Sequence, residues 1–596
     1  MRELSFDRDS LHAFYAEGGD PAEVLAEAHR RLAEADDPGV FIDLIPLAEA
    51  QAAARALPPF DTDRFPLWGL PFAVKDNIDA AGRPTTAACP AFAYVPSEDA
   101  PAVARLRAAG ALCLGKTNLD QFATGLVGLR TPYPAPRNAL DPDLPPGGSS
   151  SGSAVAVALG VAAFALGTDT AGSGRVPAAL NGVVGLKPSL GAISTRGVVP
   201  ACRTLDCVSV FAPTVADAWA AFAACAGFDP ADPFSRDRPA TGFGAAPTAF
   251  RLGVPSTATR RFSGDALQAA SFEAALGRLR ALGAEIVELD FAPFYACAAL
   301  LYEGAWVAER LAAIAEFRAA HPGALHPVTE RIIGGAEGLS AVDAFRGLYR
   351  LAEFRRQLEP VIASVDLIAV PTIPTLHTLA EIGADPIGPN SDFGTYTNFV
   401  NLLDLCGIAV PVDPRADGRP GSVTLLAAAG RDGLTASVAA ALHAAYAPGR
   451  KAPSRSAPPG AGETELLAVG AHMTGMALEP QMRGFGARPL GPARTAPCYR
   501  LAALPGAPAR PGLTRVAQRG AAVEAELWAI PTDRLGALLA AIPAPLGLGR
   551  VRLEDGREVI GFLAEAAACA AAPDITAFGG WRAYVAAQQT PSLAGV

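Results

Sequence analysis

Apolar and polar residues along the chain follow patterns that predict helices and strands in alternation. Residues 1–56 carry a helical period, as in AEVLAEAHRRLAEA, which stops before Pro58 and Pro59. From residue 67 to about 213, short apolar runs such as LPFAVKDNI and ALCLGKTN alternate with helix-like stretches such as AVARLRAAG and GSAVAVALGVAAFALG. This alternation predicts an α/β fold, with the chemistry in the loops between the elements.

The same style continues to about residue 448, so we expect one large domain over residues 1–448. Its later part carries a predicted strand at Val365–Val370 and predicted helices around residues 265–282, 302–318 and 341–358. Because 596 residues exceed the roughly 250–300 at which a single core stops growing, a second domain is expected.

A change in composition marks that second domain. The segment GRKAPSRSAPPGAGET is rich in Pro, Gly and Ser and has no apolar period, which predicts a linker over residues 449–463. Residues 464–596 then form a smaller unit, with strand patterns at Leu466–Val469, Ala496–Leu504 and Val523–Ile530.

Composition narrows the class of protein. A formal net charge of -10 with no basic run argues against a nucleic-acid partner, since phosphate binding needs clustered Lys and Arg. The start of the chain lacks the apolar core of a signal peptide, and nine cysteines without a C-x-x-C pair are typical of reduced thiols. The longest apolar run, Ala154–Leu166, is too short to cross a bilayer and predicts a buried helix. We therefore expect a cytoplasmic protein with no membrane partner.

Two loops rich in glycine and serine carry the candidate chemistry, GGSSSGS over residues 147–153 and GTDTAGSGR over residues 167–175. Glycines let a backbone approach a ligand and turn its N–H groups inward, as an oxyanion hole demands. One such loop alone is more simply interpreted as a turn. Two of them downstream of a lysine at the end of a strand favour a catalytic site.

A serine nucleophile needs a base, and histidine is the usual one. None of the seven histidines lies between residues 30 and 320, and none has a recognisable triad context. Lys75 ends the apolar run PFAVK, where burial lowers the pKa of a lysine and lets it accept a proton. The alternative is a salt bridge from Lys75 to Asp76 or Asp79.

Residues 110–117, GALCLGKT, match the pattern of a nucleotide-binding P-loop. A P-loop follows a strand and opens a helix, whereas here the helix-like AVARLRAAG comes first and ALCL has the pattern of a strand. The context therefore argues against nucleotide binding.

Lys75 in K-D-N-I, the G-G-S-S segment and G-T-D-T-x-G-S-x-R-x-P-A together resemble the amidase signature family, and residues 397–411 resemble its C-terminal segment. The resemblance implies a mixed central sheet wrapped by helices, no cofactor and no metal. It implies Ser173 as nucleophile, Ser149 as a bridging serine that typically lies on a cis peptide, and Lys75 as base. The implied oxyanion-hole amides are those of Thr170, Ala171, Gly172 and Ser173. Ser151 and Ala171 stand where many members have glycine, which bears on the substrate.

Tyr302 and Arg310 are the candidate substrate-binding pair. They are eight residues apart, which is about 80° around one helix, so both side chains could face one pocket. Arginine with a tyrosine hydroxyl suits a small carboxylate. The alternative is an exposed arginine paired with Glu309 or Glu303. This segment and the C-terminal unit resemble the allophanate hydrolases of the family, which implies allophanate (urea-1-carboxylate) as substrate and adds Gly125 to the expected substrate-binding residues.

Residues 464–596 resemble the small α+β C-terminal domain of those enzymes, whose fold is similar to gamma-glutamyl cyclotransferases. The glycine-rich turn Val469–Met473 is expected to bind an anion, and His472 beside it to assist decarboxylation of N-carboxycarbamate. A domain that only dimerises is the equal alternative. The resemblance also implies a homodimer and a functional link to urea carboxylase or biuret hydrolase. An amidotransferase of the same family would leave this unit unexplained, and intact Lys75, Ser149 and Ser173 weigh against a non-catalytic scaffold.

Overall fold

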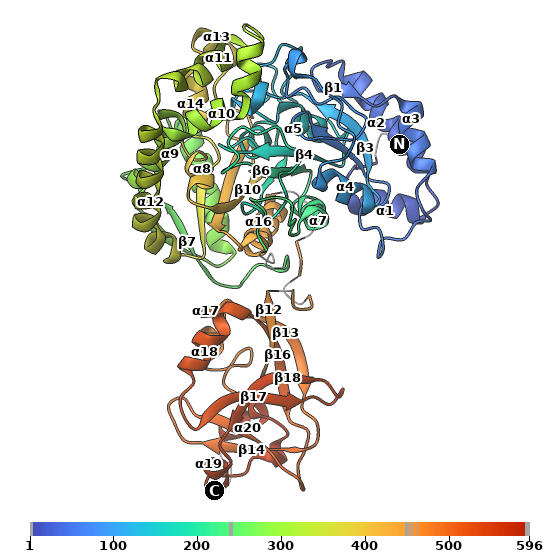
Figure 1. Ribbon diagram of the computed structural model, residues 1–596. Coiled ribbons are helices and arrows are strands. Elements are labelled where there is room, and N and C mark those ends of the chain that lie inside the picture. The colour runs from blue at the N-terminus through green and yellow to red at the C-terminus, as the bar shows by residue number, and fades with distance from the viewer. Residues whose placement is uncertain (1–3, 238–241, 447–451, 455–456, 461, 590–596) are drawn as a thin grey trace. The chain divides into compact units, whose positions relative to one another are not determined.

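The computed structural model describes residues 4–237, 242–446, 452–454, 457–460 and 462–589 (Figure 1). The chain divides into two compact units, of which the first comprises residues 1–240, 251–280 and 286–451. The second comprises residues 241–250, 281–285 and 452–596, so two short segments of the predicted large domain group with the C-terminal residues. The predicted linker lies partly outside the described residues, and the predicted domain boundaries stay a prediction.

The first unit is built on an 11-stranded sheet in the order β1-β3-β2-β4-β6-β5-β10-β11-β9-β7-β8. The strand β2 pairs in parallel with β3 and β4, and β7 with β9, while β4–β6 and β10–β11 are antiparallel, so the predicted mixed sheet is confirmed. The strands are β1 (Phe41–Leu44), β2 (Pro71–Lys75), β3 (Leu112–Thr117), β4 (Phe164–Asp169), β5 (Val184–Lys187), β6 (Cys207–Ala212), β7 (Phe250–Pro255), β8 (Ala284–Leu289), β9 (Leu367–Pro371), β10 (Leu405–Val412) and β11 (Gly421–Ala428).

Helices surround this sheet. In Figure 1, α1 to α3 lie at one edge and α9 and α12 at the opposite edge. The helices are α1 (Arg8–Ala16), α2 (Pro21–Ala35), α3 (Leu47–Arg55), α4 (Pro101–Ala108), α5 (Ser151–Ala158), α6 (Val176–Leu180), α7 (Val215–Cys225), α8 (Ala266–Ala281), α9 (Ala292–Glu303), α10 (Ala305–Ala320), α11 (Pro327–Gly334), α12 (Ala341–Ala363), α13 (Leu379–Ala384), α14 (Gly388–Phe393), α15 (Phe399–Leu402) and α16 (Asp432–Tyr446). Every residue of β2 and β4 is buried, as expected for strands covered on both faces.

Two predicted helical segments contain strands. The expected helix over Ala154–Leu166 is wrong, because α5 ends at Ala158 and β4 begins at Phe164. Gly160, with φ +64°, takes the left-handed conformation that commonly ends a helix. In the helical segment 1–56, the four residues of β1 pair with β3. Both strands were missed because a short apolar run has the same appearance in a buried strand and in a buried helix.

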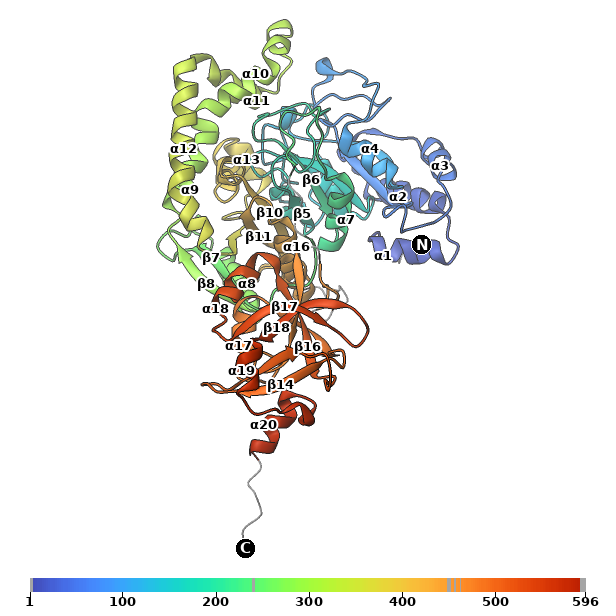
Figure 2. The same cartoon turned by 60° about the horizontal axis from the view of Figure 1, so that its bottom comes forward.

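The second unit holds a five-stranded sheet in the order β13-β16-β12-β18-β17 and a two-stranded sheet of β14 and β15. Helices α17 and α18 lie beside the larger sheet, and α20 is near the C-terminus (Figure 2). The elements are β12 (Glu463–Ala468), α17 (Glu479–Gly484), β13 (Arg488–Arg494), β14 (Tyr499–Leu504), β15 (Arg510–Arg515), β16 (Glu524–Pro531), α18 (Leu535–Ala541), β17 (Leu546–Arg552), β18 (Glu558–Ala564), α19 (Ala566–Ala570) and α20 (Trp581–Gln589). Within the described part of the chain, no helix is long and apolar enough to cross a membrane.

Candidate functional site

Lys75 ends β2 inside the first unit, with none of its side chain exposed. Its Nζ lies 2.7 Å from the Oγ of Ser149 and 2.7 Å from the Oγ1 of Thr168. The Asp76 carboxylate contacts Thr86 and the ammonium of Lys116 instead. Within the described residues no ion pair joins Lys75 to Asp76 or Asp79, so the geometry favours the serine contact over the salt bridge.

Burial determines the protonation of Lys75. It lowers the pKa of the amine to about 7, because the charged form loses its hydration, while the carboxylates of Asp120, Asp206 and Asp169 act in the opposite direction. A substantial fraction of Lys75 is therefore neutral near pH 7 and can accept a proton from a hydroxyl in contact with it.

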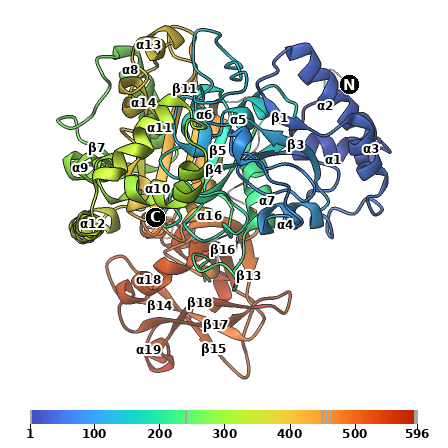
Figure 3. The same ribbon diagram turned by 45° about the horizontal axis from the view of Figure 1, so that its top comes forward.

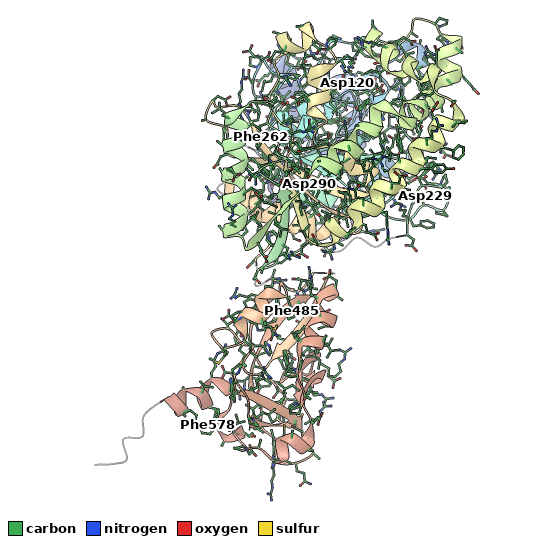
Figure 4. The ribbon with its side chains drawn as sticks, turned by 90° about the vertical axis from the view of Figure 1, so that its left-hand side faces the viewer. Asp120, Asp229, Phe262, Asp290, Phe485 and Phe578 are labelled. Carbon is green, nitrogen blue, oxygen red and sulfur yellow. The ribbon has the colours of Figure 1, made fainter. Side chains whose placement is uncertain are left out.

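Ser149 sits on a loop that Asp120 holds in place. The Gly148–Ser149 peptide bond is cis, and the Ser149 carbonyl accepts a hydrogen bond from the Asp120 amide at 3.0 Å. A Cβ on Gly148 would lie 2.0 Å from the Asp120 carboxylate, and one on Gly125 would lie 2.4 Å from it. Asp120 itself is fully buried in the interior of the unit (Figure 4). The glycines thus let two loops close around one carboxylate.

The loop that carries Ser173 follows β4 and is ordered by Asp169. The Asp169 carboxylate accepts the amides of Gly172 at 2.9 Å and Gly174 at 3.0 Å, and the Nε of Arg175 at 2.8 Å. Ser173 lies between these anchored residues and is 2% exposed. A nucleophile on such a loop is held in one orientation without a flexible chain to order during reaction.

The backbone amides of this loop differ in their availability. The Gly172 N–H already donates to Asp169. No described residue accepts a hydrogen bond from the N–H of Thr170, Ala171 or Ser173. The predicted oxyanion hole therefore has three available donors in this structure rather than four.

Tyr302 and Arg310 do not share a helix, so the argument from one helical wheel is wrong. Tyr302 lies in the last turn of α9, Arg310 lies in α10, and Gly304 separates the two helices. The side chains still meet, with the guanidinium carbon of Arg310 5.2 Å from the centre of the Tyr302 ring.

Arg310 is not the exposed arginine of the alternative interpretation. It is 2% exposed, and its Nη1 lies 3.4 Å from the Thr124 Oγ1. The Glu309 carboxylate binds the backbone and hydroxyl of Thr204. The Nε and Nη2 of Arg310 are buried without a described hydrogen-bond partner, as expected of donors that await an anion.

Several residues that support the site were not predicted. Thr168 contacts Lys75, Asp206 accepts from the Thr170 hydroxyl, and Thr397 donates to the Ala171 carbonyl at 2.6 Å. Asn401 donates to the carbonyl of Asp169 at 2.8 Å. Thr168 lies within the quoted GTDTAGSGR motif and could have been named. Asp206 and Asn401 carry no local signal, because their contacts are made only by folding.

The P-loop pattern of residues 110–117 lies mostly within β3, and a helix precedes it. Lys116 has no exposed surface, and its Nζ donates to the Thr85 Oγ1 at 2.8 Å. It is directed into the protein and not toward a phosphate. Among the described residues no group of three or more His, Cys, Asp or Glu side chains could hold a metal ion.

In the second unit, His472 follows β12 on the predicted glycine-rich turn. Its Nε2 lies 2.8 Å from the Gln481 Oε1, and its ring stacks on Phe562 with centroids 4.6 Å apart. Burial lowers the pKa of His472, and the charge of Arg510 acts in the same direction. A Cβ on Gly470 would lie 1.9 Å from Pro511, so only glycine fits there. Packing and ligand binding are both compatible with this geometry.

Comparison with known proteins assigns a family to each part of the chain. Residues 23–435 match the Amidase family, and residues 464–586 match the allophanate hydrolase C-terminal domain. The urea amidolyase of Saccharomyces cerevisiae is 41% identical over 546 residues, which cover 88% of this chain and 30% of that protein. The chain therefore spans less than a third of the length of this curated relative.

Solved structures show the same similarity in three dimensions. The Kluyveromyces lactis allophanate hydrolase is 38% identical, with a TM-score of 0.87 and coverage of 98% of this chain and 99% of that one. A glutamyl-tRNA(Gln) amidotransferase chain of Symbiobacterium thermophilum is also 38% identical, but over only 61% of this chain and 80% of that protein.

Proposed function

Because the chain belongs to the amidase family and its residues 464–586 match the allophanate hydrolase C-terminal domain, we propose that it hydrolyses allophanate to ammonia and N-carboxycarbamate. The observation that carries the proposal is the buried contact of Lys75 with Ser149, two loops away from a rigidly held Ser173. The likeness to a solved allophanate hydrolase over almost its whole length supports this substrate over other amides.

In the proposed reaction, neutral Lys75 takes a proton from Ser149, and Ser149 takes one from Ser173. The Ser173 oxygen attacks the carbonyl of the terminal amide, and the amides of Thr170, Ala171 and Ser173 stabilise the oxyanion. The proton returns along the relay to the leaving nitrogen, which departs as ammonia. Water then attacks the acyl-enzyme, releasing N-carboxycarbamate and restoring the Ser173 hydroxyl.

The substrate carboxylate is proposed to bind Arg310 beside Tyr302. The two unpartnered guanidinium donors of Arg310 would form charge-assisted hydrogen bonds with it. Gly125 is proposed to border the same subsite. A neutral amide would leave those buried donors unpaired, which gives selectivity for an anionic substrate.

For the C-terminal unit we propose a role in the decarboxylation of N-carboxycarbamate, with His472 as the candidate residue. The buried position of His472 near the charge of Arg510 supports an anion site there. Dimerisation as its only role is the competing proposal, and a homodimer stays a prediction.

Two relatives called urea amidolyase support a link between this activity and urea breakdown. Since the chain covers only 30% of each, the rest of those proteins supplies further activity. We propose that urea carboxylase, or a biuret hydrolase, supplies the allophanate.

Mass spectrometry of the purified protein mixed separately with allophanate, biuret, malonamate and glutamine tests the proposal. Rapid loss of allophanate with little loss of glutamine is expected. Preferential hydrolysis of glutamine would instead favour the activity of an amidotransferase, and no loss of any amide would favour a scaffold.

A further inference from the structure

A cavity of about 360 Å³ lies between the end of α9, the start of α10, α11 and α14 (Figures 1 and 3). We call it the entry cavity. Arg130 and Arg331 are the charged groups among its described lining residues, with polar groups from Tyr302, Asn390 and Ser391. No described carboxylate lines it, and no ion pair joins Arg331 to a described acid. The cavity therefore has a net positive lining.

Arg130 is built into the wall of the entry cavity. It is 2% exposed, its Nη1 donates to the Thr124 carbonyl at 3.0 Å and its Nη2 to the Pro386 carbonyl at 2.9 Å. Its Nε has no hydrogen-bond partner among the described residues. The nearby Asp120 carboxylate accepts the backbone amide of Arg130 at 2.8 Å and makes no bond to the guanidinium. A buried cation with a spare donor is a group that an anion can complete.

The entry cavity adjoins the residues proposed to bind the substrate carboxylate. Tyr302 lines it and also lies against the guanidinium of Arg310. Thr124 joins the two arginines, since its carbonyl binds Arg130 and its hydroxyl contacts Arg310.

A second connection leads from the cavity to the serine loop. The Asn390 side chain accepts the Leu126 amide at 2.8 Å, and the Leu126 carbonyl accepts the Gly148 amide at 2.8 Å. The inner wall of the cavity is thus two hydrogen bonds from the loop of Ser149.

We propose that the entry cavity admits small carboxylates to the site and that Arg130 is a second specificity-determining cation beside Arg310. This inference rests on the proposed function, because the substrate class is an amide that bears a carboxylate. Two cations without a facing acid raise the local concentration of an anion. They also penalise a neutral amide, which leaves the buried donors of Arg130 and Arg310 unpaired.

Binding to full-length Ser173→Ala protein, measured by calorimetry, tests the proposal without turnover. Malonamate keeps the carboxylate and replaces the central NH of allophanate by CH2, whereas biuret replaces the carboxylate by a neutral amide. We expect Arg130→Lys to weaken malonamate binding about tenfold, because lysine lacks the fork of donors. Arg331→Gln should weaken it about threefold through lost attraction. Neither change should alter the binding of biuret.

Arg356→Gln is the matched control, since Arg356 is an exposed arginine of α12 that does not line the entry cavity. It should leave both affinities unchanged. Equal losses for malonamate and biuret, or no loss with Arg130→Lys and Arg331→Gln, would overturn the proposal. If Arg130→Lys melts at a much lower temperature than the parent, the exposed Arg331→Gln decides alone.

The same measurements separate this inference from the proposed function. Arginine-dependent binding of malonamate by a protein that hydrolyses no allophanate would leave the entry cavity in place and refute the activity. Allophanate hydrolysis with binding that is indifferent to both arginines would do the reverse.

Discussion

The Nζ of Lys75 lies 2.7 Å from the Oγ of Ser149, and both side chains are fully buried. Away from water, a lysine in contact with a hydroxyl and without an ion pair is poised to be a base. The distance is also short enough for the proton to pass in either direction, which the return of the proton to the leaving nitrogen requires.

This contact predicts the pH dependence of the reaction. Lys75 must be neutral to accept a proton, and burial lowers its pKa to about 7. We expect kcat/KM for allophanate to rise about tenfold per pH unit below that value and to level off above it. Stopped-flow measurement of ammonia release across this range checks the profile. Biuret as a neutral substrate controls for ionisation of allophanate, and a rate that falls as the pH rises through 7 would contradict a neutral lysine base.

Ser173→Ala should abolish ammonia release, because no acyl-enzyme forms without the serine oxygen. The side chain is small and buried, so the fold should persist. Turnover by purified Ser173→Ala protein is the measurement, with its melting temperature as the control for folding. Ser151→Ala is a matched comparison, since Ser151 lies in the neighbouring loop and makes no contact with Lys75 among the described residues. Comparable activity of Ser173→Ala and the parent would remove Ser173 as the nucleophile.

Lys75→Ala and Ser149→Ala should each reduce kcat by about 10³-fold or more, and the double variant should be little worse than either one. Residues that act as one relay lose their joint effect when any member is removed. The measurement is kcat for the four members of the double-mutant cycle. Losses that multiply fully would mean that Lys75 and Ser149 act independently.

Arg310→Ala should raise KM for allophanate by about 10²-fold and change kcat less, because it removes a charged binding partner. Its activity on biuret relative to allophanate should increase, since the buried cation that penalises a neutral group is gone. Arg310→Lys should recover part of the affinity. Unchanged selectivity between the two substrates in Arg310→Ala would exclude a role in recognising the carboxylate.

The catalytic loops were recognisable from sequence because each is a continuous motif, whereas the surroundings of Arg310 depend on contacts across the chain. Eight residues at a helical spacing suggested one helix, but Gly304 separates α9 from α10 there. Arg130 is 180 residues from Arg310 in the sequence, and only the fold brings both to Thr124. Likewise Ala154–Leu166 is apolar throughout, so no period distinguished the end of α5 from the start of β4.

The roles of the two compact units can be separated by truncation. A chain that ends near Gly449 retains Lys75, Ser149 and Ser173, so it should release the first ammonia at an undiminished rate. It also retains the segments 241–250 and 281–285, which group with the C-terminal residues. Thr248, for example, donates to the Ala487 carbonyl at 2.7 Å and would lose that partner. Circular dichroism and a melting curve must therefore accompany the rate.

If the C-terminal unit promotes decarboxylation, carbon dioxide and the second ammonia should lag behind the first in the truncated chain, because N-carboxycarbamate then decays unaided. Separate addition of residues 464–596 should shorten the lag, since a small intermediate can diffuse between proteins. His472→Ala in that added segment should fail to shorten it while keeping the same circular dichroism spectrum. Gln481→Ala removes the hydrogen-bond partner of His472 and should have a smaller effect, because the ring still stacks on Phe562. Identical timing of the two ammonia releases with and without the C-terminal unit would mean that its role is dimerisation or stability.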